Sequence, residues 1–440
     1  FSFTPGIPTR DLIQMVGGLP IFSKAHYEAN NLDLEESSPT PLLGSGPYVP
    51  ARYDFGNTSI YERNPDYWGK DLPINQGRHN FDAIRLEYYG DYNAAFEGFK
   101  GGSYLFRNEA SSKDWATSYD FPAIDKGHVI KTEFPDGSIA SGQAFVMNMR
   151  RPNLQDPRVR EAVSLLFNFE WSNEQLFYGL YARVNSFWEN SDLAATGLPT
   201  PEELALLEPL ADKLPAGVLD QEAILAPPSG DRQLDRRNLR RASRLLDEAG
   251  WEVGDDGLRR KDGRTLRLEF LNDSATFDRV INPYVENLRS AGIDAVHQRV
   301  DNAEATNRER PPSYDFDLVT MIFGQGYVPG SGLKQYFGSE TADESVFNKA
   351  GLKSEAVDAL IDHVIAAKTQ EDLNTGVRAL DRVLRAYHIW VPQWFKDTHT
   401  VAYYDVFRHP DPLPPYALGN LDFWWYDADR AEELKAEGAF

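Results

Sequence analysis

A glutamine and a tyrosine stand in a glycine-rich segment that directly follows a mostly apolar run. The apolar run spans residues 316–323, and residues 324–332 then hold four glycines and one proline. Glycine lets a ligand approach the backbone closely, a glutamine side chain both donates and accepts hydrogen bonds, and a tyrosine offers a ring and a hydroxyl. The pattern predicts a ligand-contacting loop, with a simple exposed turn as the alternative. Its candidate residues are Phe323, Gly324, Gln325, Gly326 and Tyr327.

A second stretch, residues 176–194, carries a lone arginine among aromatic and polar side chains. Arg183 could grip a carboxylate or a phosphate with two parallel hydrogen bonds. The alternative is an arginine on the solvated surface. The other candidate ligand contacts of this stretch are Tyr181, Asn185, Ser186 and Trp188.

Motifs for catalysis or metal binding do not occur. The sequence has no Gly-x-x-x-x-Gly-Lys, no His-Glu-x-x-His and no Gly-x-Ser-x-Gly, and its eight histidines are scattered. It contains no cysteine, which excludes thiolate metal sites and thiol catalysis. We therefore expect no catalytic residue, no metal and no cofactor.

Composition limits the remaining functions. A formal net charge of −22 argues against a nucleic-acid partner and against binding to an anionic membrane, and it favours a monomer. A chain of 440 residues predicts two or more domains. No apolar run approaches the roughly 18 residues that would span a bilayer. The absence of cysteine fits an oxidising compartment.

The candidate residues must be positioned by alternating strands and helices. Strands are predicted at 142–149, 293–300 and 315–323, the last of them buried because of its apolar run. Helices are predicted to begin at Asp156 and at Ser172, and others over 235–251, 276–291, 354–367 and 370–387. The alternation predicts an α/β layered fold.

Several blocks resemble, in order along the chain, the periplasmic solute-binding proteins of ABC importers. They are "GSGPYVPARYDFGNTSIYERNPDYWGK" (44–70), "FVMNMRRPNLQDPRVREAVSLLFN" (145–168), "ASRLLDEAGW", "LRSAGIDAVHQRVD", "VDALIDHVI" and "VPQWF". The set is similar to the oligopeptide/dipeptide-binding family (family 5, cluster C). "PGSGLKQYFGS" and the end "AYYDVFRHPDPLPPYALGNLDFWWYD" resemble its YejA-like branch.

The resemblance implies a two-lobe fold (type II) whose crossing strands join the lobes beside a ligand cleft. The expected lobes are 1–145, 146–395, and 396–440 returning to the first. Asn148 and Trp394, which flank the expected crossings, join the candidate ligand contacts. Residues 1–24 resemble the middle of a first lobe, so we expect an upstream stretch to be missing and residues 1–440 to be incomplete as a folding unit.

The implied function is a periplasmic receptor, its signal peptide removed, that delivers a peptide or peptide conjugate to an inner-membrane ABC permease. The resemblance implies one departure: classical peptide-binding members of this family carry an Asp in this loop that pairs with the peptide amino terminus. Its expected position is near Gly326, and glycine cannot supply that charge. Two alternatives remain: an extracellular carbohydrate-active enzyme, suggested by the many acidic and aromatic residues, and a scaffold or chaperone-like protein on the same fold.

Overall fold

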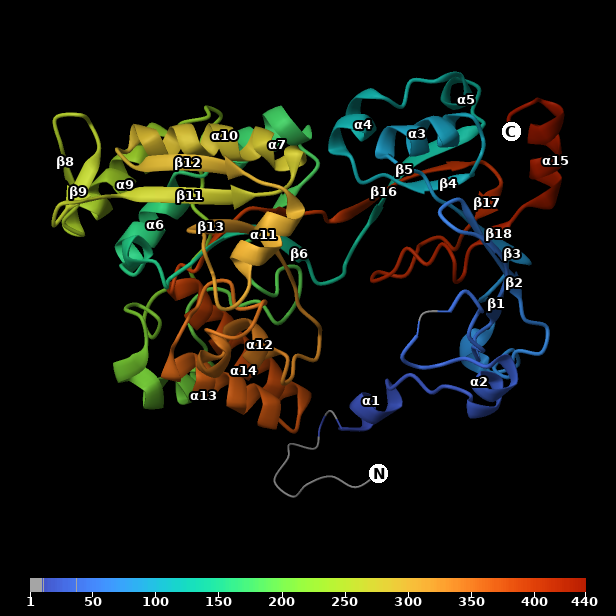
Figure 1. Ribbon diagram of the computed structural model, residues 1–440, viewed down its shortest axis with the longest axis horizontal. Coiled ribbons are helices and arrows are strands. Elements are labelled where there is room, and N and C mark those ends of the chain that lie inside the picture. The colour runs from blue at the N-terminus through green and yellow to red at the C-terminus, as the bar shows by residue number, and fades with distance from the viewer. Residues whose placement is uncertain (1–9, 11, 37) are drawn as a thin grey trace. The chain divides into compact units, whose positions relative to one another are not determined.

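The computed structural model describes residues 10, 12–36 and 38–440, and the chain divides into two compact units (Figure 1). One unit consists of residues 138–397 with the described residues before Val16. The other consists of Val16–Gly137 and Thr398–Phe440. Each unit is described by itself.

A five-stranded mixed sheet forms the centre of the 138–397 unit, and its strand order is β12-β11-β13-β6-β14. The strands β11, β12 and β13 are parallel, and β6 is antiparallel to both of its neighbours. The lobe boundary expected at residue 145 falls inside β6, whose residues 144–147 have no exposed surface. The bounds are β12 Asp294–Arg299, β11 Arg267–Asn272, β13 Leu318–Gly324, β6 Ser141–Met147 and β14 Trp390–Pro392.

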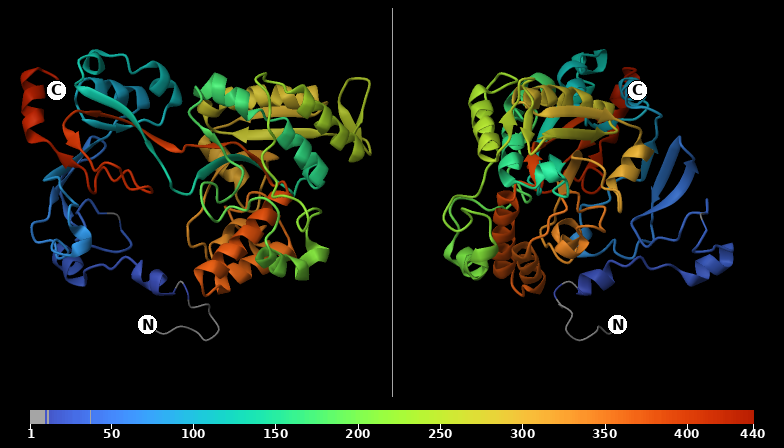
Figure 2. Two further views of the ribbon diagram at one scale, coloured as in Figure 1. Left: turned by 180° about the vertical axis from the view of Figure 1, so that it is seen from behind. Right: turned by 60° about the vertical axis from the view of Figure 1, so that its left-hand side comes forward.

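Helices cover both faces of this sheet, as Figure 1 shows from the front and Figure 2 from behind. One apolar core joins one face of the sheet to α6 (Pro157–Leu165), α7 (Phe169–Phe177), α9 (Arg236–Glu248) and α10 (Ala275–Ser290). A second core joins the opposite face to α8 (Pro201–Leu207), α12 (Leu333–Phe337), α13 (Glu355–Ala366) and α14 (Gln370–Ala386). The predicted α/β layering is confirmed, and we call these sides the α10 face and the α14 face.

Local signals explain where the helices begin. The Asp156 side chain accepts a hydrogen bond from Arg158 N (2.9 Å), so it caps α6 as predicted. The helix predicted to begin at Ser172 begins earlier, because Asn168 caps α7 by accepting from Trp171 N at 2.9 Å. Ser172 is buried inside this helix and donates to the carbonyl of Asn168 at 2.7 Å.

The strand predicted to be wholly buried is only partly so. In β13, Leu318 and Val319 are buried, but the side chain of Ile322 is 58% exposed. A central strand is covered only where helices lie over it, and the α10 face is left open at the end of β13. An apolar side chain is therefore available to a partner next to the glycine-rich loop.

The remaining elements of the 138–397 unit are short. They are η2 Pro152–Leu154, β7 Ala182–Arg183, η3 Glu208–Lys213, β8 Glu252–Val253, β9 Arg259–Lys261, β10 Arg264–Thr265, α11 Asn302–Glu309, η4 Ser339–Thr341 and β15 Trp394–Phe395.

The other unit is built on two three-stranded sheets, ordered β1-β2-β3 and β4-β16-β5, and the pair β17-β18. Trp424 lies in its core without exposed surface, whereas Trp425 is 43% exposed. The strands are β1 Tyr48–Asp54, β2 Thr58–Arg63, β3 Ala83–Glu87, β4 Phe106–Asn108, β5 Val129–Pro135, β16 Thr398–Tyr404, β17 Phe407–Arg408 and β18 Trp425–Tyr426. The helices are α2 Lys24–Asn30, η1 Pro73–Asn75, α3 Tyr92–Lys100, α4 Ser112–Thr117, α5 Pro122–Asp125 and α15 Ala428–Ala436, with α1 Leu12–Gly17 at the division between the units.

Candidate ligand-binding site

Four strands of the five-stranded sheet end at one edge. The parallel strands β12, β11 and β13 end there, and β14 does too, because it is antiparallel to β6 just as β13 is. Free backbone groups and loops converge at such an edge, which is where open α/β sheets bind ligands. Gly324, the last residue of β13, lies beside Ser141, the first residue of β6. We call this the carboxyl edge.

On the α10 face, two of the three side chains in the row nearest the carboxyl edge are polar. Thr320, Phe145 and Val391 form one cross-strand row. Because side chains alternate along a strand, the next row towards the edge holds Ile322, Gln143 and the position after β14, which is Gln393. The Gln393 backbone N–H donates to Gln143 O at 3.0 Å, so it continues this register.

Several of these polar groups are buried without a partner. Both side-chain polar atoms of Gln393, a residue with no exposed surface, lack a hydrogen-bond partner among the described residues. The Oγ1 of Thr320 is buried and also unpaired within that part of the chain. Gln143, by contrast, donates from Nε2 to Met321 O at 3.1 Å. Buried polar groups are normally paired, so these unpaired ones make the carboxyl edge a candidate ligand-binding site.

Arg183 lies next to this polar row. It is paired with Trp394 across the short β7–β15 ladder. Its guanidinium carbon lies 5.0 Å from the ring centre of Phe169 and 5.8 Å from that of Phe167, which are α10-face residues. All three guanidinium nitrogens are buried and have no hydrogen-bond partner in the described chain. This burial lowers the pKa of Arg183 to about 10, which still leaves it charged at neutral pH.

Aromatic side chains form a wall beside Arg183. The Trp394 ring lies 4.6 Å from the ring centre of Phe177 and 5.9 Å from that of Tyr181. Phe277, from the first turn of α10, stacks on it at 6.3 Å and 15°. Phe177 and Trp394 are buried, at 4% and 8% exposed, whereas Tyr181 and Phe277 keep part of their ring surface open and could stack on a ligand. The structure thus brings together the predicted residues Tyr181, Arg183 and Trp394.

The predicted loop separates into a core part and an open part. Phe323 is buried on the α14 face, where it packs 5.0 Å from Phe187. Gly324 and Gly326 are exposed, and a Cβ atom added at Gly326 would meet nothing within 4 Å. Tyr327 is 46% exposed, and its hydroxyl accepts from Ile139 N at 3.0 Å. The Nε2 of Gln325 is buried and has no partner among the described residues.

Four predicted residues make hydrogen bonds or core contacts within the unit. Asn148 follows the end of β6 and so lies at the opposite edge of the sheet, where its Nδ2 donates to the carbonyls of Tyr314 and Phe316 at 3.0 Å. Asn185 accepts from Ala226 N at 3.0 Å, and Ser186 Oγ accepts from Trp188 N at 2.9 Å. Trp188 has no exposed surface and belongs to the core of the α14 face.

Sequence reasoning missed Gln143, Thr320 and Gln393. A signal was present, because each is a polar residue inside an otherwise apolar strand: "GQAFVM", "LVTMIF" and "WVPQWF". A polar side chain in such a run needs a partner when it is buried. Their shared position at one edge follows only from the strand order.

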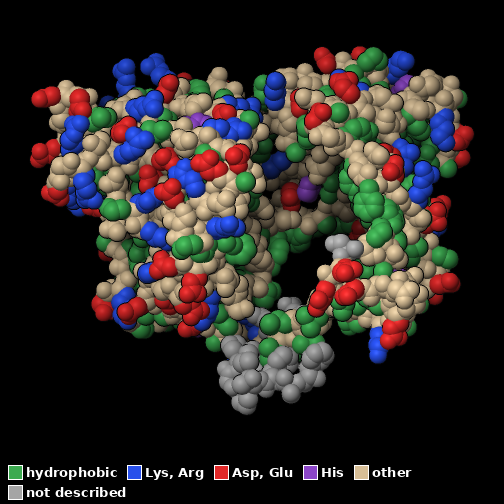
Figure 3. Space-filling view, in the orientation of Figure 1, with side chains coloured by type: hydrophobic (Ala, Val, Ile, Leu, Met, Phe, Trp, Pro, Cys, Tyr) green, Lys and Arg blue, Asp and Glu red, His purple; other side chains and the backbone are tan. Residues whose placement is uncertain are grey.

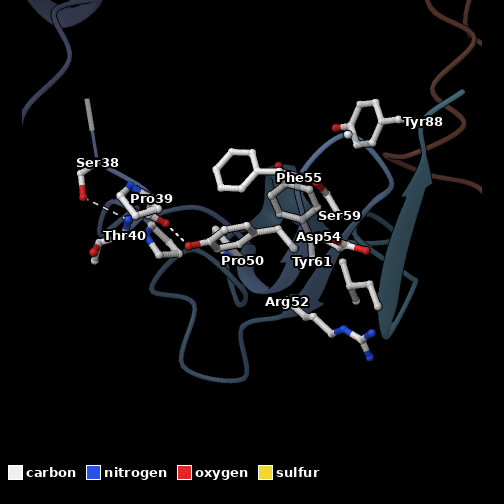
Figure 4. A pocket seen from close by; sticks show the side chains of 14 residues that line it. Ser38, Pro39, Thr40, Pro50, Arg52, Asp54, Phe55, Ser59, Tyr61 and Tyr88 are labelled. Atoms are coloured by element: carbon white, nitrogen blue, oxygen red, sulfur yellow. Dashed lines mark hydrogen bonds between the residues drawn. The ribbon is translucent and has the colours of Figure 1, made fainter. Parts of the chain in front are cut away.

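The other unit holds a pocket of about 390 Å³ against the β1-β2-β3 sheet, shown in Figure 4. Pro39 and Thr40 lie at one end and Tyr88 at the other. Phe55 is 76% exposed and Tyr88 is 51% exposed, so the pocket offers open aromatic surface. The described lining includes one carboxylate, Asp54, and none of its side-chain polar atoms is buried without a partner.

Neither the surface charge nor a group of metal-binding side chains distinguishes one of the two sites. Acidic and basic side chains are interspersed over the visible face of the molecule, without a continuous basic surface (Figure 3). Within the described ranges, no group of three or more His, Asp or Glu side chains is placed to hold a metal ion. None of the described helices is long and apolar enough to cross a bilayer.

Comparisons with known proteins point to one family over most of the chain. The family description "Bacterial extracellular solute-binding proteins, family 5 Middle" matches residues 3–345. "Probable peptide-binding protein YejA" of Agrobacterium fabrum is 40% identical over 94% of this chain and 69% of its own length. YejA of Escherichia coli is 37% identical over 97% of this chain and 70% of its own length. The chain therefore spans roughly two thirds of these relatives.

A solved structure shares the fold. The oligopeptide-binding protein AppA of Bacillus subtilis, in complex with a nonapeptide, matches with a TM-score of 0.62. The match has 19% sequence identity and covers 94% of this chain and 71% of AppA. At this identity the likeness establishes the architecture alone.

Proposed function

Because the chain belongs to the bacterial extracellular solute-binding proteins of family 5, whose fold has two lobes, we propose that it is an extracytoplasmic receptor for a peptide or peptide-like ligand. It delivers that ligand to the permease of an ABC importer and works as a monomer in the periplasm. Family membership points to a binding protein rather than an enzyme.

One observation of the structure supports this proposal most strongly. The carboxyl edge gathers buried, unpaired polar groups from Arg183, Thr320 and Gln393 beside a wall of aromatic rings. Unpaired groups of this kind weaken the folded state unless a ligand completes them. A peptide fits the chemistry, because its amides both donate and accept and its side chains can stack on the rings.

We propose ligand contacts through the loop after β13, mainly through its backbone and through Gln325 and Tyr327. We also propose that the ligand contacts Tyr181, Arg183 and Trp394. Asn148, Asn185 and Ser186 are proposed to support the fold, since their polar groups are hydrogen-bonded within the unit. Trp188 is proposed to do so through its fully buried ring, although its Nε1 has no partner among the described residues.

Calorimetric titration with synthetic peptides tests the receptor function. We expect saturable binding of one peptide per chain. Titration with oligosaccharides, followed by product analysis, tests the rival enzyme: its catalysis requires two carboxylates, and the aromatic pocket's described lining has one. Released sugar with no peptide binding would favour the enzyme, and weak, unselective binding of every peptide would favour the scaffold alternative.

Acetylation of a bound peptide's amino terminus is expected to leave its affinity unchanged. The exposed loop residue Gly326 carries no charge, and no acidic side chain occurs between Gly324 and Gly332 to pair with an ammonium group. A charge-assisted hydrogen bond contributes about 1.5–3 kcal/mol, or roughly 10- to 150-fold in affinity. Paired titrations of free and acetylated peptides measure the difference. A loss of that size on acetylation would show that an acidic residue elsewhere holds the amine.

A further inference from the structure

We propose that Arg183 is the receptor for a carboxylate of the ligand, so that the ligand is an acidic peptide or conjugate. This inference rests on the proposed receptor function and specifies its ligand class. It predicts that the ligand group bound at Arg183, at the carboxyl edge with Gln393 and Thr320, carries a negative charge.

The state of the guanidinium group points to an absent anion. Its three nitrogens are buried against Phe167 and Phe169 without a hydrogen bond from the described chain. Glu170 is the acidic group whose charge acts on it, but no ion pair joins the two. A buried cation without a partner is destabilising, so a role that is realised only on binding explains why it is there.

The side chain is also free to reach a ligand. The residue as a whole keeps part of its surface exposed, whereas the nitrogens have none. A rotation of the guanidinium towards solvent would break no hydrogen bond within the described chain. The β7–β15 pairing fixes the backbone of Arg183 beside Trp394, and the Val184 backbone N–H next to it donates to Gln393 O at 3.4 Å, so Arg183 lies close to the polar row along the chain.

The neighbouring groups suit a carboxylate better than a phosphate. A single arginine matches one carboxylate in charge and in its planar, two-point geometry. A phosphate would leave about one uncompensated negative charge beside phenylalanine rings, in a chain with a formal net charge of −22. Gln393 and Thr320, at the same end of the sheet, are neutral, and their buried polar atoms have no partner among the described residues, so neither supplies a second positive charge for a dianion.

The test uses mixed tetrapeptide pools and the whole chain. One pool has free carboxyl termini, one has amidated termini with glutamate side chains, and one is amidated with glutamine in place of glutamate. We expect the first or the second pool to bind about 10- to 150-fold more tightly than the third. Which of the two binds tells whether the terminal or the side-chain carboxylate is recognised.

Variants connect that preference to Arg183. Arg183→Gln is expected to abolish the difference between acidic and neutral pools, and Arg237→Gln, which changes an exposed arginine on α9, is expected to preserve it. Arg183→Gln should also raise the melting temperature of the ligand-free protein, because it removes an uncompensated buried charge. This readout does not depend on any peptide.

Two results would overturn the inference while leaving a peptide receptor intact. One is equal binding of acidic and neutral pools, and the other is an acidic preference that survives Arg183→Gln. If no pool binds, the proposed function fails. In that case an unchanged or lowered melting temperature of Arg183→Gln would show that the guanidinium is not an uncompensated charge and would also reject the carboxylate role.

Discussion

Replacing Asp381 with alanine is expected to lower the free energy of unfolding by about 3–5 kcal/mol, because it leaves a buried arginine without its counter-charge. Asp381 has no exposed surface. Its carboxylate accepts from Phe187 N and Ala195 N, each at 3.0 Å, and lies 3.1 Å from Arg385. A loss of this size is a large part of the 5–15 kcal/mol that stabilises a typical domain.

Urea unfolding followed by tryptophan fluorescence measures this effect. Glu371→Ala is the control, because it removes an exposed carboxylate from the first turn of the same helix, α14. Its expected cost is about 0.3–1 kcal/mol, the contribution of a charge near a helix terminus. Equal unfolding midpoints for the two variants would show that the Asp381–Arg385 pair does not hold α14 to the 186–195 segment.

Replacing Trp188 with alanine is expected to cost about 3–5 kcal/mol of stability, the usual cost of removing a large aromatic side chain from a core. Trp188 has no exposed surface and belongs to the core of the α14 face. The sequence made it a candidate ligand contact. The structure indicates packing, so a loss of affinity in this variant should only follow a loss of folded protein.

Trp425→Ala is the matched control, since that ring is 43% exposed at the short β18 strand. Its unfolding midpoint should stay close to that of the wild type. Peptide titration below the unfolding transition separates the two roles of Trp188. If Trp188→Ala retains its stability and loses affinity, the ring contacts the ligand.

Much of the fold could be predicted from local signals. Asp156 and Pro157 fix the start of α6, and the alternation of strands and helices gives the layered unit. The start of α7 was misplaced, because Asn168 is as good a cap as Ser172 and only the structure shows which of them accepts the bond. The exposure of Ile322 could not be predicted, because an apolar run does not reveal where the covering helices stop.

The candidate site was only partly visible in the sequence. Arg183 and the loop after β13 were found by residue type, and the placement of Arg183 beside Trp394 depends on the pairing of two short strands far apart in the chain. Asn148 was chosen as a candidate for its nearness to an expected crossing. It follows an antiparallel strand, so it lies at the opposite edge from the loop and donates to backbone carbonyls there.

A crystal structure of the whole chain with the peptide that binds it most tightly tests the central claim most directly. The proposed function predicts that this peptide lies at the carboxyl edge, within hydrogen-bonding distance of residues 324–327 and against the Trp394 ring. It further predicts that a carboxylate of the peptide is paired with Arg183. A peptide that instead occupies the aromatic pocket beside Phe55 and Tyr88, with the carboxyl edge unchanged, would contradict the account.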